Sequence, residues 1–180
     1  GYLAYGNHDD KVKGMGELEY SFVPKKEYAN EFPIHSLKLR YQSDINQYGQ
    51  NYLYTSFDNV FLMLKRQEDN RIGYLKKTEL TWTNEYHSGF SFKLIARRES
   101  QQTSRLIPFE MLAKVGDTEG TPVHAIDSSE GEITLRYAPH ETFFQTQWNR
   151  FPVNIDYPIF TLTHTIALKN TLGSDYNYNH

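Results

Sequence analysis

The sequence predicts an all-β protein whose strands follow one another as an antiparallel meander. Three observations lead to this prediction. Apolar and polar residues alternate along most of the chain, which is the pattern of strands with one buried and one wet face. Residues that favour turns separate the alternating segments, and helical periodicity is scarce. At 180 residues the chain is long enough for one domain with a sizeable core.

The composition limits the classes of function. Fourteen Tyr, eleven Phe and two Trp make 15% of the residues aromatic, although the mean hydropathy is polar; such chains suit surfaces that are half apolar and half wet. The net charge of −3 leaves no basic footprint for nucleic acid. The lack of cysteine excludes disulfides and thiolate metal sites, and no run of about 18 apolar residues predicts a transmembrane helix.

The N-terminal part predicts two paired strands after a short first one. Residues 1–6 alternate, and the turn-forming "NHDD" follows them. In residues 11–22 the apolar side chains fall on one parity, and lysines and glutamates fall on the other. Residues 36–44 repeat this pattern after a longer connection at 23–33. We therefore expect residues 11–22 to pair with residues 34–44.

The middle of the chain predicts a second hairpin. Residues 74–86 and 89–99 alternate in the same way, and "EYHSGF" around Gly89 is typical of a hairpin turn. We expect residues 72–86 to pair with residues 90–99.

The next segments are less regular. Residues 57–70 hold an unbroken apolar run that suits either a short helix or a buried strand, and we favour the strand. The prolines and glycines of residues 101–129 predict one strand near 107–115 followed by a long loop. Residues 132–138 then alternate again.

Residues 150–168 combine a stiff, aromatic beginning with a two-faced strand. Pro152 and Pro158 suit neither a helix nor a central strand. From Phe160 onward, apolar side chains point one way, with His164 among them, and threonines point the other way. A lone histidine at such a position is more often packed or near an interface than catalytic.

Strand length and charge favour a segment of a transmembrane-type β-barrel, and a soluble β-sandwich is the alternative. Several alternating segments run for 10 or more residues, whereas strands of soluble domains average about 5–6 and those of membrane barrels need about 9–11. The polar faces carry both signs of charge, which would line a watery lumen in a barrel and face solvent in a sandwich. We interpret residues 1–180 as a single all-β region, a fragment of a larger outer-membrane barrel, because the chain starts inside an alternating segment.

The two-residue period also predicts sidedness, because a shift of one residue would move a whole set of side chains across the sheet. One face of one sheet should carry Val12, Leu18, Tyr20, Leu37, Leu39, Tyr41, Leu80, Trp82, Phe90, Phe92, Leu94, Ile133, Leu135, Tyr137, Phe160, Leu162 and Ile166. The opposite face should carry Lys13, Glu17, Lys38, Arg40, Lys77, Glu79, Lys93, Arg97, Arg136 and Thr163. Lys76, Thr78 and Asn84 share the apolar parity, so they should lie beyond the hydrocarbon zone.

The candidate chemical sites are weak. His8, Asp9 and Asp10 could chelate a divalent cation, but Asn and Asp are ordinary turn residues, and the histidines lack zinc-site spacing. We predict no metal and no cofactor. The aromatic segment 48–59 suits either a platform for carbohydrate or the rim of a barrel.

Two pairs of glutamates share a strand face and could be imagined as glycosidase pairs: Glu79 with Glu85 and Glu17 with Glu19. The interleaved Lys77, Lys93 and Arg97 would hold these carboxylates ionised, which disfavours an acid role. We predict no catalytic residue and no enzymatic activity.

Residues 133–179 carry a resemblance in the motifs "LRYAP", "FFQT", "RFPVNIDYPIFTLTHT" and "LGSDYNYN". They resemble a family of Gram-negative outer-membrane proteins of unknown function, which join an N-terminal carboxypeptidase-regulatory-like domain to a C-terminal β-barrel. The earlier "YSFVPKKEYA", "LKLRYQSDI" and "DNVFLMLKR" fit the same barrel region in order. The chain is similar, more distantly, to surface-antigen barrels. The regulatory-like domain has no counterpart in these residues.

The resemblance implies a location and an architecture, with no catalytic residues to transfer. It implies a barrel segment in the cell outer membrane with a structural, transport-associated or surface-antigen role. Outer-membrane lipid and other envelope proteins are then the expected partners, and open strand edges invite self-association. Trp82, Trp148, Phe151 and Tyr157 are the expected membrane-interface aromatics. The alternative function is a soluble, surface glycan-binding β-sandwich module.

Overall fold

The chain folds into strands and connecting loops. The computed structural model describes residues 1–7, 10–24, 31–47, 72–103, 109–111, 120–146, 149–153, 156–167, 169, 174 and 177–180, and no helix occurs among them. The predicted all-β class is therefore confirmed. Residues 57–70, for which a strand was favoured over a helix, lie outside the described residues.

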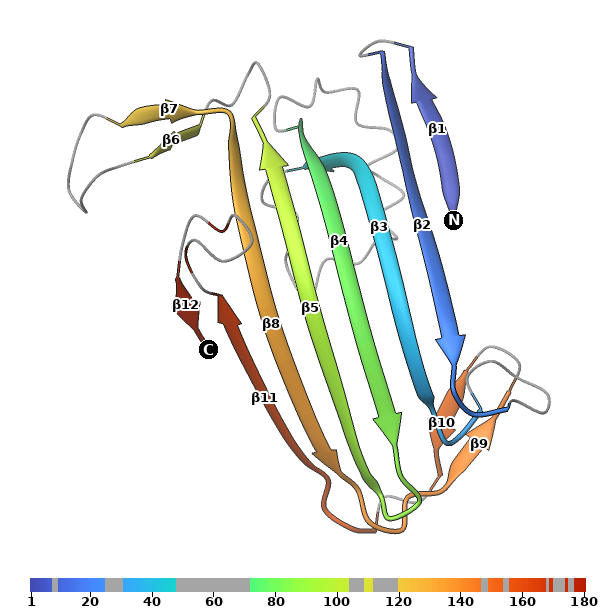
Figure 1. The fold of residues 1–180 in the computed structure, drawn as a ribbon. Coiled ribbons are helices and arrows are strands. Elements are labelled where there is room, and N and C mark those ends of the chain that lie inside the picture. Colours follow the sequence, from blue (N-terminus) through green and yellow to red (C-terminus); the bar gives the residue numbers. More distant parts are fainter. Residues whose placement is uncertain are drawn as a thin grey trace, which may run out of the picture.

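Eight strands form one large antiparallel sheet in the order β1-β2-β3-β4-β5-β8-β11-β12 (Figure 1). Their bounds are β1 (Tyr2–Gly6), β2 (Lys11–Ser21), β3 (His35–Gln47), β4 (Ile72–Glu85), β5 (Phe90–Gln102), β8 (Ala125–Tyr137), β11 (Phe160–Ala167) and β12 (Tyr178–Asn179). Each strand pairs with the preceding and following strand of this order, so the meander is confirmed. Both predicted pairings are present, since Leu18 faces Leu39 across β2 and β3, and Trp82 faces Leu94 across β4 and β5.

Two small hairpins are inserted into the meander at opposite ends of the sheet (Figure 1). One pairs β6 (Phe109–Met111) with β7 (Thr121–Val123), and the other pairs β9 (Phe143–Gln145) with β10 (Arg150–Pro152). The strand expected near 107–115 corresponds in its described part to β6. The sequence pattern did not predict β7, β9 or β10.

The prediction of a long loop up to residue 129 is wrong, because β8 already begins at Ala125. Residues 125–129 lack apolar alternation, so the sequence pattern did not indicate a strand there. They are strand because β5 is long enough to pair with them, from Gln102 facing Ala125 to Arg98 facing Ser129. Tertiary pairing thus overrides weak local propensity here.

The registers confirm the predicted sidedness. One continuous row of facing residues is Tyr20, Leu37, Trp82, Leu94, Ile133 and His164. The next row is Leu18, Leu39, Leu80, Ala96, Gly131 and Ile166. Since side chains alternate between faces, the predicted apolar set shares one face of the large sheet, and the predicted charged set shares the other. We call them the apolar face and the charged face.

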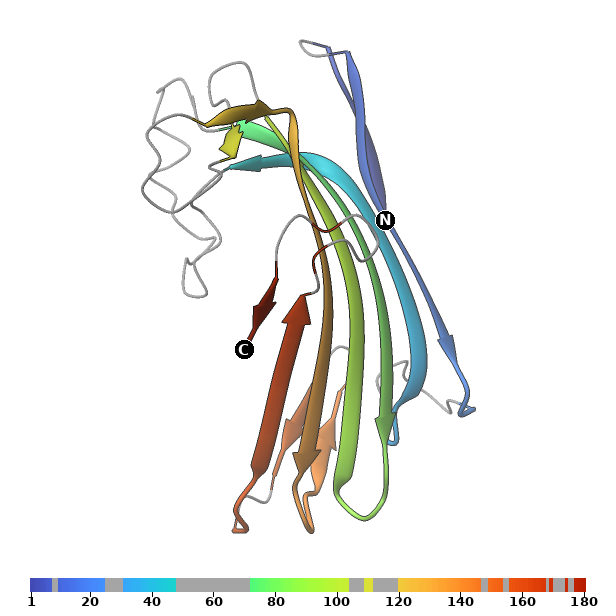
Figure 2. The ribbon, with the colours of Figure 1, turned by 60° about the vertical axis from the view of Figure 1, so that its left-hand side comes forward.

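The sheet is curved, and hairpin β9–β10 lies on its concave side (Figure 2). Arg150 of this hairpin pairs with Glu85, which belongs to the charged face of β4. The charged face is therefore concave and the apolar face is convex. Among the described residues, the only buried apolar ones are Ile95, Ala138 and Ala167, so this part of the chain leaves the apolar face uncovered.

Candidate functional site

The apolar face forms a band across the middle and lower part of the long strands. Four rows make up this band, from the row of Phe90, Tyr137 and Phe160 to the row of Leu80, Ala96 and Gly131. Rows lie two residues apart, so three intervals span about 20 Å along the strands, which is similar to the apolar band of about 25 Å on membrane barrels. The band is open to its surroundings: the exposed fractions of Leu18, Leu39, Leu80 and Leu162 are 75%, 46%, 41% and 64%.

Polar residues bound this band on the side toward hairpin β6–β7. Thr78 faces Arg98 in the next row, and Lys76 faces Ser100 in the row after that. Thr78 and Lys76 are thus at and beyond the margin of the band, where the sequence pattern required them. Asn84 is different, because it lies inside the band; its Nδ2 donates a hydrogen bond to Tyr86 Oη at 2.9 Å.

Aromatic side chains gather in the part of the band nearest the β4–β5 turn. The rings of Trp82 and Phe92 meet edge to face, with centroids 5.1 Å apart, and Tyr86 stacks on Phe90 with centroids 6.0 Å apart. His35 lies between Trp82 and Phe22, at 6.4 and 4.7 Å. Aromatic rings at the edge of an apolar band are typical of the interfacial girdle of membrane barrels.

The four aromatic residues expected at the membrane interface lie in different parts of the chain. Trp82 lies on the apolar face with 39% of its surface exposed. Phe151 lies in β10 opposite Phe144, and both are exposed. Tyr157 precedes β11, with its ring 5.0 Å from that of His140. Trp148 lies outside the described residues. The interfacial role of all four stays a prediction.

A ladder of alternating charge crosses the charged face. The register aligns Glu17, Arg40, Glu79, Arg97 and Glu130 in one row. Arg97 contacts both acidic neighbours, with Nε 3.1 Å from Glu79 and Nη1 3.2 Å from Glu130. Their side chains are only 15–26% exposed. Because Arg97 is paired with acidic groups on both sides, this part of the concave face can be charged and densely packed at the same time.

The glutamates considered as glycosidase pairs form ion pairs with basic side chains. Glu17 and Glu19 both contact Lys38 Nζ at 3.3 Å. Glu79 binds Lys77 and Arg97, whereas Glu85 lies six residues further along β4, about 20 Å away. A retaining pair needs about 5–5.5 Å and one protonated member, so Glu79 and Glu85 cannot form one.

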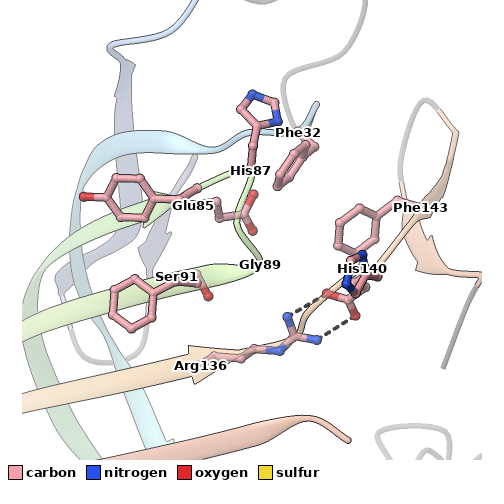
Figure 3. A pocket seen from close by; sticks show the side chains of 11 residues that line it. Phe32, Glu85, His87, Gly89, Ser91, Arg136, His140 and Phe143 are labelled. Carbon is pink, nitrogen blue, oxygen red and sulfur yellow. Dashed lines mark hydrogen bonds and ion pairs between the residues drawn. The ribbon is translucent and has the colours of Figure 1, made fainter. Parts of the chain in front are cut away.

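A pocket of about 210 Å³ lies at the β4–β5 turn on the concave side (Figure 3). Two bidentate ion pairs hold it together. Arg136 donates to Glu141 at 2.6 and 2.7 Å, and Arg150 donates to Glu85 at 2.5 and 2.9 Å. The Ile34 amide also donates to Glu85 at 2.9 Å.

Aromatic rings complete this cluster. The Arg150 guanidinium lies 4.3 Å from the Phe143 ring centroid, and Phe143 contacts Phe32 at 5.6 Å. The "RFP" motif thus ties hairpin β9–β10 to the end of β4. Sequence reasoning missed this role, because Glu85 and Arg150 are 65 residues apart; an arginine inside an aromatic, proline-rich segment was the only available signal.

Replacing Arg150 with Met should lower the free energy of unfolding by about 1.5–3 kcal/mol, the range for hydrogen bonds to charged groups. The change leaves the Glu85 carboxylate, whose side chain is only 14% exposed, with the Ile34 amide as its remaining hydrogen-bond donor among the described residues. Arg98→Met is the matched control, because Arg98 is exposed on the other face, and it should change stability by less than about 0.5 kcal/mol. Denaturant titration of both variants measures the difference; equal effects would show that the ion pair contributes nothing.

Of the three residues proposed as metal ligands, Asp10 is the one among the described residues. His8 and Asp9 lie outside the described residues, and Asp10 accepts a hydrogen bond from Tyr5 Oη at 2.9 Å. In the described part of the chain, no group of three or more His, Asp or Glu side chains could hold a metal ion. In the same part, no helix is long and apolar enough to cross a membrane.

In comparisons with known proteins, no protein-family model, curated protein or solved structure matches the chain.

Proposed function

We propose that this chain forms part of the wall of an outer-membrane β-barrel, with a structural, transport-associated or surface-antigen role and no enzymatic activity. One observation carries the proposal. The convex side of a curved antiparallel sheet presents a continuous, exposed apolar band, while its concave side presents a row of alternating charges in which Arg97 pairs with Glu79 and Glu130. A contiguous apolar surface of this kind needs a covering in water, and lipid would provide it.

The two faces suit the two environments that a barrel wall separates. Strands of 11–14 residues in β2, β3, β4, β5 and β8 reach or exceed the length of about 9–11 residues needed to cross the hydrocarbon layer. The charged face would meet a water-filled lumen, where its ions stay solvated. The alternative, a soluble glycan-binding sandwich, requires a second sheet about 10 Å from the apolar face, and no described strand occupies that position.

The edges of the sheet fit the same proposal. Among the described strands, β1 and β12 each have a partner on one side only. In a closed barrel, further strands would pair with these edges and remove the open backbone groups. A second copy of the chain could do the same, so the partners we propose are lipid, adjoining barrel strands and other envelope proteins.

Cell fractionation of the full-length gene product in a Gram-negative host tests the proposal. The protein should sediment with the outer membrane, and its gel mobility should differ between heated and unheated samples, as expected of a stable barrel. Recovery in the soluble fraction together with specific glycan binding would overturn it in favour of the sandwich module.

A further inference from the structure

The apolar face contains a groove of about 440 Å³, within the range of about 300–1,000 Å³ that is usual for small-molecule sites. Ala96 and Gly131 face each other across β5 and β8 and form its floor. Leu80 and Trp82 line one side, and His164 and Ile166 line the other. The groove therefore lies between larger side chains, at the point where β5 and β8 carry only Ala96 and Gly131.

The backbone does not require a glycine at this position. A Cβ added to Gly131 would meet only Ile166 Cγ2, at 3.8 Å, which is an ordinary contact. A larger side chain would thus enter the groove without displacing the sheet. The depression exists because Ala96 and Gly131 are small, and within the described part of the chain no other side chain fills it.

Two cations lie just beyond the floor, on the same face. Arg98 follows Ala96 by two residues along β5, and Lys76 lies one row further, both exposed. Neither forms an ion pair with a described residue. On β3, β4, β5 and β8 the other side chains of these rows are Tyr41, Ser43, Thr78, Ser100, Asp127 and Ser129, so Asp127 is the one acidic group in these described rows. The margin keeps a positive excess next to the groove.

We propose that this groove binds one acyl chain of an anionic phospholipid, with the phosphate held by Arg98 and Lys76. The inference rests on the proposed membrane location and names a partner for the apolar face. Charge complementarity favours this occupant: an apolar channel ends at two cations, at the depth where the band gives way to polar residues and where headgroups lie. Long basic side chains can reach outward to such headgroups.

Quenching of Trp82 tests the site, because this ring lines the groove. The chain has two tryptophans, so all variants carry Trp148→Phe, which leaves Trp82 as the sole emitter. The protein is reconstituted into phosphatidylcholine vesicles that contain a small fraction of phospholipid with brominated acyl chains, either phosphatidylglycerol or phosphatidylcholine. Each basic side chain should favour the anionic lipid about fivefold, so half-quenching should need about 5–25-fold less brominated phosphatidylglycerol.

Three variants separate the parts of the site. Gly131→Leu fills the floor and should remove the preference. Gly16→Leu is the matched control on the same face, where nothing lies within 4 Å of an added Cβ, and should keep it. Replacing Arg98 and Lys76 together with Gln should reduce the preference to about onefold.

Equal quenching by both lipids in the parent protein, or an unchanged preference in Gly131→Leu, would overturn the lipid site and leave the membrane location standing. Absence of quenching by either lipid would overturn the membrane proposal as well.

Discussion

In the proposed membrane location, replacing Leu162 with Arg should lower the stability of the protein by about 2–4 kcal/mol, the penalty for a cation on a lipid-facing surface near the bilayer midplane. Leu162 is 64% exposed on the apolar face and faces Leu135 in the second of the four rows of the band. In lipid, the guanidinium at this depth loses its hydration and has no acidic partner in its row. Equilibrium unfolding by denaturant in phospholipid vesicles measures the change.

The neighbouring position provides the control. Thr163 lies on the charged face, with its Oγ1 3.2 Å from Thr134 Oγ1, so Thr163→Arg should change stability by less than about 0.5 kcal/mol. The two variants introduce the same side chain one residue apart in the same strand. Similar losses in both would contradict the assignment of the two faces to lipid and water.

Gly89→Ala should lower the free energy of unfolding by about 2–4 kcal/mol. Gly89 has a φ of 84°, where an L-residue costs about 1–2 kcal/mol. An added Cβ would also lie 2.3 Å from the Ala138 carbonyl oxygen. The Gly89 carbonyl accepts a 2.8 Å hydrogen bond from the Ala138 amide, so the turn cannot move away without disturbing this link to the end of β8.

Gly131→Ala gives the comparison for this second prediction. Its Cβ has ordinary contacts, and alanine in a strand loses less entropy on folding than glycine, so its stability should stay equal or rise slightly. Denaturant titration of both variants is the measurement. A Gly89→Ala protein as stable as the parent would show that the turn adopts another conformation.

The faces and neighbours of the long strands could be predicted from the sequence because both depend on local pattern. Alternation in β2, β3, β4 and β5 fixes which side chains share a face, and the short turn at Gly89 fixes a register. The first five residues of β8 could not be found this way. Asp127, Ser128 and Ser129 have weak strand preference, and their conformation comes from pairing with the end of β5.

The candidate sites were harder to predict, because they depend on residues that are distant in the sequence. The Glu85–Arg150 pair needs hairpin β9–β10 to fold back over the concave face, and nothing in "RFPVNIDYP" indicates that direction. The groove depends on Ala96 and Gly131 becoming neighbours, and a single small residue in an alternating strand does not by itself indicate a groove. Residue pairs of this kind become visible only when the register is known.

The order of strands in the large sheet has a consequence for how it can assemble. Among the described residues, each strand of the large sheet pairs with those before and after it in the meander, and the inserted hairpins leave these registers intact on both sides of β8. Partners are therefore close in sequence, which keeps the entropy of loop closure low. The sheet can grow by addition of one strand at a time to an existing edge, with each new strand covering the edge that received it. Assembly of this kind ends only when β1 and β12 both acquire a neighbour.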